Sequence, residues 1–160
     1  MNNSADISFS IATTEKQFSD AERLFLEYAE SLEIDLAFQG FAKELESIHL
    51  QYNKPVGGLI IVYHHDIPIG CAGIRRLDDE TGELKRMFVQ PQFRGYKSGQ
   101  KLLAMAIDLA KELGYKKLRL DTIPSMQPAL KLYRLHGFYE IPAYRFNPVE
   151  GAIFMEKILD

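Results

Sequence analysis

Residues 89–103 read VQPQFRGYKSGQKLL, and this stretch decides how the rest of the chain is interpreted. It passes from the end of a strand pattern, through a loop that contains Gly95 and Gly99, into an amphipathic helix pattern. A helix that begins here points unpaired backbone N–H groups and the positive end of its dipole at the loop. Three cations add to that local field: Arg94, Lys97 and Lys101. The stretch favours an anion site of the kind that holds a pyrophosphate, and an ordinary strand-to-helix loop with solvated cations is the open alternative.

Two known phosphate-binding motifs do not fit this loop. If Gly99 is the second glycine of a P-loop, Arg94 stands at the first glycine, Gln100 at the lysine and Lys101 at the hydroxyl residue. The dinucleotide fingerprint needs three spaced glycines in a parallel strand–helix–strand unit, whereas the strand before this loop belongs to an antiparallel meander. The sequence therefore excludes both motifs.

Hydrophobic periodicity predicts strands and helices on both sides of the loop. Strands are expected over 7–13, 59–64, 69–74, 83–89, 116–122 and 152–159, and helices over 15–32, 41–48, 98–113 and 127–136. Thr13 or Thr14 is available to cap the first helix, and Gly114 and Gly137 are placed to end the last two. Helices that interrupt a mostly antiparallel sheet give a mixed α/β (α+β) layer architecture, which we expect as a single domain over residues 1–160.

Composition narrows the class of protein. The formal net charge is −3, so the overall field opposes binding to a nucleic acid. Cys71 is the single cysteine, which excludes an intramolecular disulfide, and its apolar strand context predicts a small buried side chain. The chain shows neither a signal-peptide pattern nor an apolar run long enough for a membrane span, so we expect a cytoplasmic protein without a membrane partner.

Two motifs together indicate a family. Residues 94–99 read RGYKSG and follow VQP at 89–91, and residues 129–138 read ALKLYRLHGF. This pair resembles the GNAT superfamily of acetyl-CoA-dependent N-acetyltransferases, whose signatures are Gln/Arg-x-x-Gly-x-Gly/Ala and Leu-Tyr-x-x-x-Gly-Phe. The chain departs from the family at Lys97, which replaces the middle glycine, and at Met126, which replaces a common asparagine. Lys97 must therefore adopt ordinary dihedral angles or accept backbone strain.

The resemblance implies a fold and a cofactor site. The fold is a central, mostly antiparallel twisted sheet with splayed strands, flanked by about four helices. Acetyl-CoA is the implied cosubstrate: its pantetheine arm would follow the strand before the loop, and the amides from Gly95 to Gln100 would bind its pyrophosphate. The implied cofactor contacts are Met87, Phe88, Val89, Arg94, Gly95, Tyr96, Lys97, Ser98, Gly99, Gln100, Met126 and Tyr133.

The resemblance also implies catalytic roles. The Met87 N–H would stabilise the oxyanion of the transferring acetyl group. Amine acetylation further needs a base for the ammonium proton and an acid for the leaving thiolate, and these positions match Glu83 and Tyr133. The structural alternatives are a solvated carboxylate beside Lys85 for Glu83 and a packed core aromatic for Tyr133.

The acceptor is less clearly indicated by the sequence. Loops 33–41 and 142–151 are candidates for the walls of its pocket, and their candidate contacts are Phe38, Phe41, Tyr144, Arg145 and Asn147. Aromatic side chains with the lone Arg145 suit a small primary amine that also bears a carboxylate. Amino-acid-like amines, polyamine-like amines and peptides all stay open as acceptors.

Other readings are weighed against this one. A non-catalytic acyl-CoA-binding regulatory module would keep the anion loop but lack a competent base, and the acidic balance argues against a nucleic-acid-associated factor. His64 and His65 with Asp66 could suggest a metal site, but adjacent strand residues point to opposite faces, so we expect no metal. A homodimer through edge strands near either end is left open.

Overall fold

The computed structural model describes residues 6–32 and 35–160, without the side chains at positions 38, 39 and 96. Its strands are β1 (Ile7–Ile11), β2 (Gly58–His64), β3 (Ile67–Arg76), β4 (Thr81–Val89), β5 (Lys117–Thr122), β6 (Tyr139–Ile141) and β7 (Ile153–Ile158). Its α-helices are α1 (Glu15–Leu32), α2 (Phe41–Glu46), α3 (Ile48–Gln51), α4 (Ser98–Glu112) and α5 (Gln127–Leu135), and its 3-10 helices are η2 (Leu36–Gln39) and η3 (Pro91–Tyr96). Each strand and helix expected from the periodicity is found close to its expected bounds, apart from the helix expected over 41–48.

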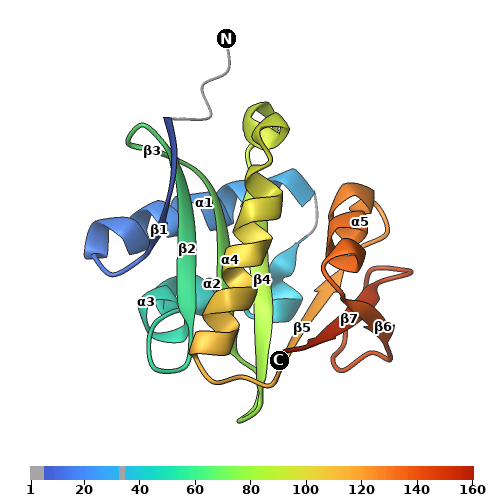
Figure 1. Cartoon of the computed structure of the whole chain (residues 1–160). Coiled ribbons are helices and arrows are strands. Elements are labelled where there is room, and N and C mark those ends of the chain that lie inside the picture. The colour runs from blue at the N-terminus through green and yellow to red at the C-terminus, as the bar shows by residue number, and fades with distance from the viewer. Residues whose placement is uncertain (1–5, 33–34) are drawn as a thin grey trace.

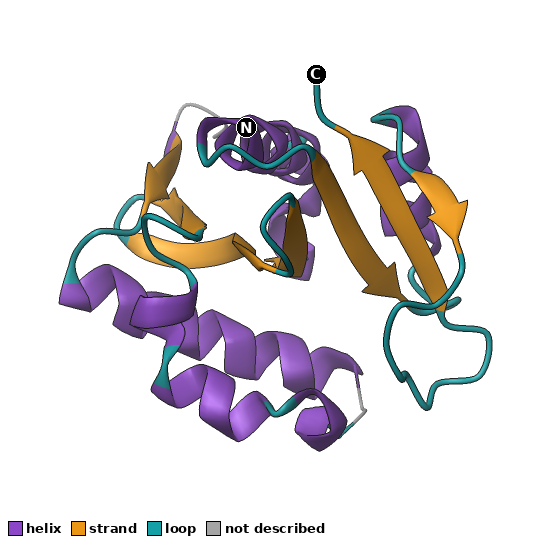
Figure 2. Ribbon diagram, turned by 90° about the horizontal axis from the view of Figure 1, so that it is seen from below, coloured by secondary structure: helices purple, strands orange, loops and turns teal. Residues whose placement is uncertain are grey.

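The strands form one open sheet in the order β1-β2-β3-β4-β5-β7-β6. Neighbours are antiparallel except β4 and β5, which run parallel and are connected through α4. The strands fall into two groups, β1 to β4 and β5 to β7, with helices on both sides (Figure 2). The mixed, mostly antiparallel sheet expected from the sequence is confirmed. Its edges are β1 and β6, and a homodimer through them stays a prediction.

Each face of the sheet carries its own hydrophobic core. Alternate residues of β2 belong to different cores: Ile60 and Val62 pack with α4 and α5, while Leu59 and Ile61 pack with α1 and α3. This alternation follows from the two-residue period of a strand. Figure 1 shows α4 in front of the sheet and α1 behind it. Cys71 is fully buried in the second core, as the sequence predicts.

Local signals account for the ends of the helices. Thr14 caps α1 reciprocally with Gln17: the Gln17 N–H donates to Thr14 Oγ1 at 3.2 Å, and the Thr14 N–H donates to Gln17 Oε1 at 3.1 Å. Gly114 and Gly137 follow α4 and α5 with φ of 91° and 92°, a backbone that glycine adopts without steric cost. None of the helices in the described part of the chain combines the length and apolar character needed to span a bilayer.

The helix content differs from the sequence-based expectation at two places. The single helix expected over 41–48 is divided at Ser47, whose hydroxyl donates to the Lys43 carbonyl at 2.8 Å and whose φ of −116° leaves the helical region. Side-chain bonds of this kind compete with the helical ladder. The stretch before α4 forms η3 rather than an open loop, with Pro91 in its first turn. The described chain thus has five α-helices instead of about four.

The packing of Gly73 yields a stability prediction. A Cβ added at Gly73 would lie 2.5 Å from Cε1 and 2.6 Å from Cδ1 of Tyr52, a fully buried ring. Gly73→Ala should therefore lower the free energy of unfolding by about 1–3 kcal/mol, measured by urea denaturation. Gly95→Ala is the control, because a Cβ there meets nothing within 4 Å and its change should stay within about 0.5 kcal/mol. Equal denaturation midpoints for the two variants would contradict this account.

Candidate active site

β4 and β5 are paired over only a short stretch. The paired positions are Thr81 with Lys117, Gly82 with Leu118 and Glu83 with Arg119. Beyond the last of these, β4 continues to Val89 while β5 stays paired with β7 up to Thr122. The two strands therefore diverge after Glu83 and Arg119, so the splayed pair implied by the sequence motifs is present.

A bulge interrupts β4 inside the diverging segment. Phe88 pairs with Cys71 and Lys85 with Gly73, so Arg86 and Met87 together oppose the single residue between those partners. Arg86 has a φ of 56°, in the left-handed region that a residue other than glycine rarely occupies. A bulge breaks the regular hydrogen-bond ladder and leaves backbone groups unpaired by the neighbouring strand. The ladder is thus disrupted at Met87, where the oxyanion donor was predicted from the sequence.

The loop before α4 is built around a strained lysine. Lys97 stands at the start of α4 with a φ of 58°, and its side chain makes no capping hydrogen bond. Of the two conformations foreseen for this replacement of glycine, the structure has the strained one. Arg94 fastens the loop to β4, because its Nε donates to the Val89 carbonyl at 2.8 Å. The Arg94 guanidinium therefore stabilises the structure of the loop and also adds positive charge to it.

The same loop leaves space and polar groups for a ligand. A Cβ at Gly95 would meet nothing within 4 Å, and one at Gly99 would meet only Leu132 Cδ2 at 3.9 Å. Ser98 Oγ is buried without a hydrogen-bond partner at the first residue of α4. The first N–H groups of a helix also lack intrahelical partners. These features fit a phosphate group of acetyl-CoA, while the side chain of Tyr96 lies outside the described part.

Tyr133 lies inside the core that covers the α4 face. Its side chain is 7% exposed, and its ring packs edge-on against Phe138 with a centroid distance of 5.7 Å. Burial raises the pKa of the Tyr133 hydroxyl, and the nearby Tyr28 and Asp121 raise it further. The hydroxyl therefore stays protonated across the neutral range, which is the state that an acid or a hydrogen-bond donor requires.

Glu83 is buried, in contrast to the solvated carboxylate considered as its structural alternative. Its Oε1 accepts from Arg75 Nε at 3.1 Å, and its Oε2 accepts from the Tyr144 hydroxyl at 2.7 Å and pairs with Arg145. Burial alone would raise the pKa of Glu83, but Lys85, Arg75 and Arg145 outweigh it and hold the pKa below the usual range. A base role for Glu83 requires one of these contacts to open, and the assignment stays a prediction.

A pocket lies where β4 and β5 diverge, with α1 and η2 contributing to its walls. The space between its lining residues, open solvent included, amounts to about 490 Å³. Its apolar lining residues are Leu32, Leu36, Leu84, Ile123, Met126 and Val149. Its polar lining residues are Tyr28, Lys85, Arg86, Asp121, Thr122 and Asn147. Residues from four elements and two loops thus converge on one hollow beside the β4 bulge.

Two buried ion pairs border this pocket. Arg86 donates to Glu44 through Nε at 3.0 Å and through a terminal nitrogen at 2.6 Å, and the Tyr52 hydroxyl donates to the same carboxylate at 2.7 Å. The Lys85 ammonium lies 3.8 Å from Asp121 Oδ1, and both side chains are 3% exposed. Burial lowers the pKa of Lys85 to about 8.

Of the predicted acceptor contacts whose side chains are described, Asn147 lines the pocket. The other three make contacts elsewhere: Phe41 lies under Arg86, Tyr144 donates to Glu83, and Arg145 pairs with Glu83. Arg145 is thus engaged with Glu83, which Arg75 also contacts, and its predicted contact with a substrate carboxylate stays a prediction. The side chain of Phe38 lies outside the described part.

Sequence reasoning missed Lys85, Arg86 and Asp121 as site residues. Their signal was weak, since the predicted strands 83–89 and 116–122 each carry several charged residues. Charged side chains are rarely buried unless they are paired. The sequence alone does not show which residue pairs with each of them.

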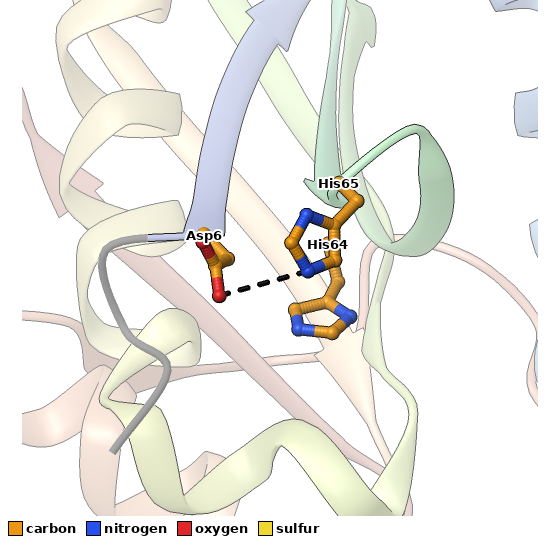
Figure 3. A group of neighbouring side chains, drawn as sticks. All are labelled: Asp6, His64 and His65. Atoms are coloured by element: carbon orange, nitrogen blue, oxygen red, sulfur yellow. Dashed lines mark ion pairs between the residues drawn. The ribbon is translucent and has the colours of Figure 1, made fainter. Parts of the chain in front are cut away.

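Two histidines and an aspartate gather at the start of β1, away from the pocket lining (Figure 3). Asp6, His64 and His65 each offer one ligand atom, and these atoms lie within 4.8 Å of one another. The expectation that the two imidazoles point to opposite faces is wrong, because His65 leaves β2 with a left-handed φ of 55° and the rings lie 4.5 Å apart. The ligand atoms of a tetrahedral Zn²⁺ lie about 3.4 Å apart. His65 Nε2 and Asp6 Oδ2 are 3.6 Å apart, and the expectation of no metal stays a prediction.

Comparisons with known proteins agree on one family. Residues 20–138 match the model of the acetyltransferase (GNAT) family. A Schizosaccharomyces pombe protein named as an uncharacterized N-acetyltransferase is 30% identical over 153 residues, covering 94% of each chain. A GNAT-family acetyltransferase structure from Staphylococcus aureus has a TM-score of 0.77 at 26% identity and covers 96% of this chain and 100% of its own. The yncA structure from Salmonella typhimurium, solved with its cofactor acetyl-CoA, shares the fold with a TM-score of 0.68 at 17% identity, covering 97% of this chain and 95% of its own.

The burial of Glu83 predicts a pH-dependent loss of stability. Glu83→Gln should lower the free energy of unfolding by about 3–5 kcal/mol at pH 7, because Arg75 and Arg145 lose their counter-charge. The folded-state pKa of Glu83 is depressed, so its ionisation stabilises the fold above the ordinary carboxyl pKa and ceases to do so as pH falls through the folded value. Urea denaturation should therefore show a smaller difference between wild type and variant at pH 3 than at pH 7. Glu80→Gln, at an exposed pair, should change stability by less than about 1 kcal/mol.

The strained backbone at Lys97 predicts that a substitution there stabilises the protein. Lys97→Gly should raise the free energy of unfolding by about 0.5–1 kcal/mol, because the relieved steric cost exceeds the entropy that glycine adds to the unfolded chain. Lys111→Gly, within α4, should lower it by about 1 kcal/mol. A loss of stability in both variants, measured by thermal and urea denaturation, would show that the left-handed backbone at Lys97 is not strained.

Proposed function

Because the chain belongs to the GNAT family of acetyltransferases, we propose that it moves an acetyl group from acetyl-CoA directly to a primary amine. The amine belongs to a small molecule, amino-acid-like or polyamine-like, or to a peptide. The observation that carries the proposal is the pocket, which lies between the diverging strands beside the β4 bulge. The matched relatives are named as N-acetyltransferases, which supports an acyltransferase rather than a non-catalytic acyl-CoA-binding module.

The loop and the start of α4 are the proposed binding site for acetyl-CoA, which supplies an acetyl group activated as a thioester. The N–H groups from Gly95 to Gln100 and the Ser98 hydroxyl would hold its pyrophosphate, with Lys97 adding positive charge. Met87 would offer its N–H where charge develops on the acetyl oxygen, and the disrupted ladder at the bulge supports this role. The uncovered space at Gly95 and Gly99 is consistent with a ligand close to the backbone.

Proton transfer falls to side chains on both sides of the diverging strands. Tyr133 is the proposed acid. Its raised pKa keeps the hydroxyl protonated, so that the hydroxyl can donate its proton to the leaving thiolate. The protonated amine must first lose a proton, and Glu83 is the base proposed on the family's pattern. In the present geometry Glu83 also holds Arg75, Tyr144 and Arg145 together at the point where β4 and β5 part.

The acid role of Tyr133 gives a direct test. Tyr133→Phe should lower kcat for acetyl transfer by about 100-fold or more, while calorimetry finds CoA affinity within a few-fold of wild type. Thiol release from acetyl-CoA is followed across pH 6–9 with a panel of amino acids, polyamines and peptides. Tyr139→Phe is the matched control, since that hydroxyl binds Glu156 at the sheet edge, and its kcat should stay within twofold. An unchanged turnover of Tyr133→Phe at every pH would remove this residue from the mechanism.

A further inference from the structure

Three side chains from the start of β1 and the end of β2 gather at one place on the surface. Ile7 pairs with His64 in the antiparallel ladder of these strands, and the His65 N–H donates to the Asp6 carbonyl at 3.1 Å. The backbone therefore holds Asp6 next to both histidines. Figure 3 shows the two imidazole rings beside the Asp6 carboxylate.

The backbone conformation of His65 brings the two rings together. Adjacent side chains of a regular strand point to opposite faces, which would keep neighbouring histidines apart. His65 instead has a φ of 55°, its ring centroid lies 4.5 Å from that of His64, and its Nε2 lies 3.6 Å from Asp6 Oδ2. The carboxylate of the group is that of Asp6, whereas the sequence had suggested Asp66.

One of the three potential ligands is held by packing, and the other two can adjust. His64 is half-buried, and its ring packs on Phe93 of η3 with a centroid distance of 4.9 Å. The side chains of Asp6 and His65 are 39% and 63% exposed, so both can change rotamer readily. The three ligand atoms already lie within 4.8 Å of one another, and a closure of at most about 1.4 Å brings them to the spacing of a tetrahedral site.

Two imidazoles and one carboxylate favour a particular class of ion. Imidazole nitrogen is a preferred ligand of Zn²⁺, Ni²⁺ and Cu²⁺, whereas Mg²⁺ and Ca²⁺ are bound mainly by oxygen. Three protein ligands also leave one position of a tetrahedral ion open, and water can fill that position at an exposed site. The set therefore suits a first-row transition-metal dication and needs no further side chain.

We propose that Asp6, His64 and His65 bind one divalent transition-metal ion, for which Zn²⁺ is the probe. The proposal departs from the expectation of no metal, whose basis was that the two imidazoles point to opposite faces. None of the three side chains is among the residues that line the pocket between β4 and β5. The site is therefore separate from the proposed acetyl transfer, and the inference goes beyond that function.

The position of the site gives the ion a structural role. β1 is an edge strand, and its one partner strand among the described residues is β2. An ion bound by Asp6 and the two histidines joins the start of this edge strand to the end of β2. β1 in turn contacts α4, because the Lys101 ammonium lies over the Phe9 ring, 4.5 Å from its centroid. Metal binding should therefore stabilise β1 and, through it, the contact with α4.

The closing experiment titrates the untagged full chain with Zn²⁺ by isothermal titration calorimetry, after treatment with a chelator and its removal by dialysis. We expect saturable binding at one site. Zn²⁺ at about 100 times its Kd should raise the Tm by about 5 °C or more, because the three ligands come together only in the folded protein. Mg²⁺ and Ca²⁺ should bind at least about 100-fold more weakly. Absence of saturable Zn²⁺ binding up to about 1 mM would overturn the site.

Single variants identify the ligands. His64→Gln, His65→Gln and Asp6→Asn should each weaken Zn²⁺ binding at least about 10-fold. His49→Gln and Asp66→Asn are the matched controls, because neither residue belongs to the group, and both should keep the Kd within about twofold of wild type. The Tm shift that Zn²⁺ causes in each variant is measured from the metal-free Tm of that variant, so that packing lost at His64 is not mistaken for a lost ligand.

Wild-type affinity in any of the three ligand variants would overturn the three-ligand site, and an equal loss in His49→Gln would show diffuse binding by surface imidazoles instead. Hydrogen exchange tests the structural role: Zn²⁺ should slow exchange of the β1 amides at least about threefold in wild type but not in Asp6→Asn. Unchanged exchange in wild type would remove that role. Calorimetry and hydrogen exchange need no acetyl transfer, so they decide this inference even if the proposed function fails.

Discussion

The parallel pairing of β4 with β5 ends after three positions on each strand, and the rest of the site depends on that early end. Had the ladder continued, the edges of both strands would be occupied by each other's N–H and carbonyl groups. Their separation after Glu83 and Arg119 instead leaves the second half of β4 without a neighbouring strand on that side among the described residues. The bulge at Arg86 and Met87, the pocket and the glycine-containing loop all follow along this one strand edge.

Buried charges line the space between the separated strands. A buried ion pair contributes little to stability on its own, because the loss of hydration offsets most of the attraction. Glu83 and Glu44 are nevertheless enclosed by arginines and tyrosine hydroxyls, which keeps both carboxylates ionised. The desolvation of such a cluster costs free energy, but the cluster gives the pocket a defined pattern of charge. Lys85 and Arg86 of this cluster line the pocket directly.

Hydrophobic periodicity and capping residues were sufficient to predict most of the fold, because strands and helices depend on neighbours close in sequence. The loop before α4 was also predictable as a strand-to-helix connection, and its strained backbone at Lys97 was one of the two conformations considered. The charge network was not, since Glu83 meets Tyr144 across 61 residues and Arg86 meets Glu44 across 42. Such pairings depend on which strands become neighbours. The orientation predicted for His64 and His65 was wrong for a related reason. His65 has a left-handed backbone at the end of β2, and this changes the alternation of side chains along the strand.

The strand order also has a consequence for how the protein emerges during synthesis. β1 to β4 are neighbours in sequence and in space, so this half of the sheet can assemble as soon as it leaves the ribosome. In the other half, β7 is inserted between β5 and β6 although it follows both in the chain. β6 has no partner until β7 is made, and β5 has only its three positions on β4. The nascent chain therefore completes the loop before α4 earlier than it completes the pocket, and a ligand of that loop would stabilise the first half of the sheet before the last strands are made.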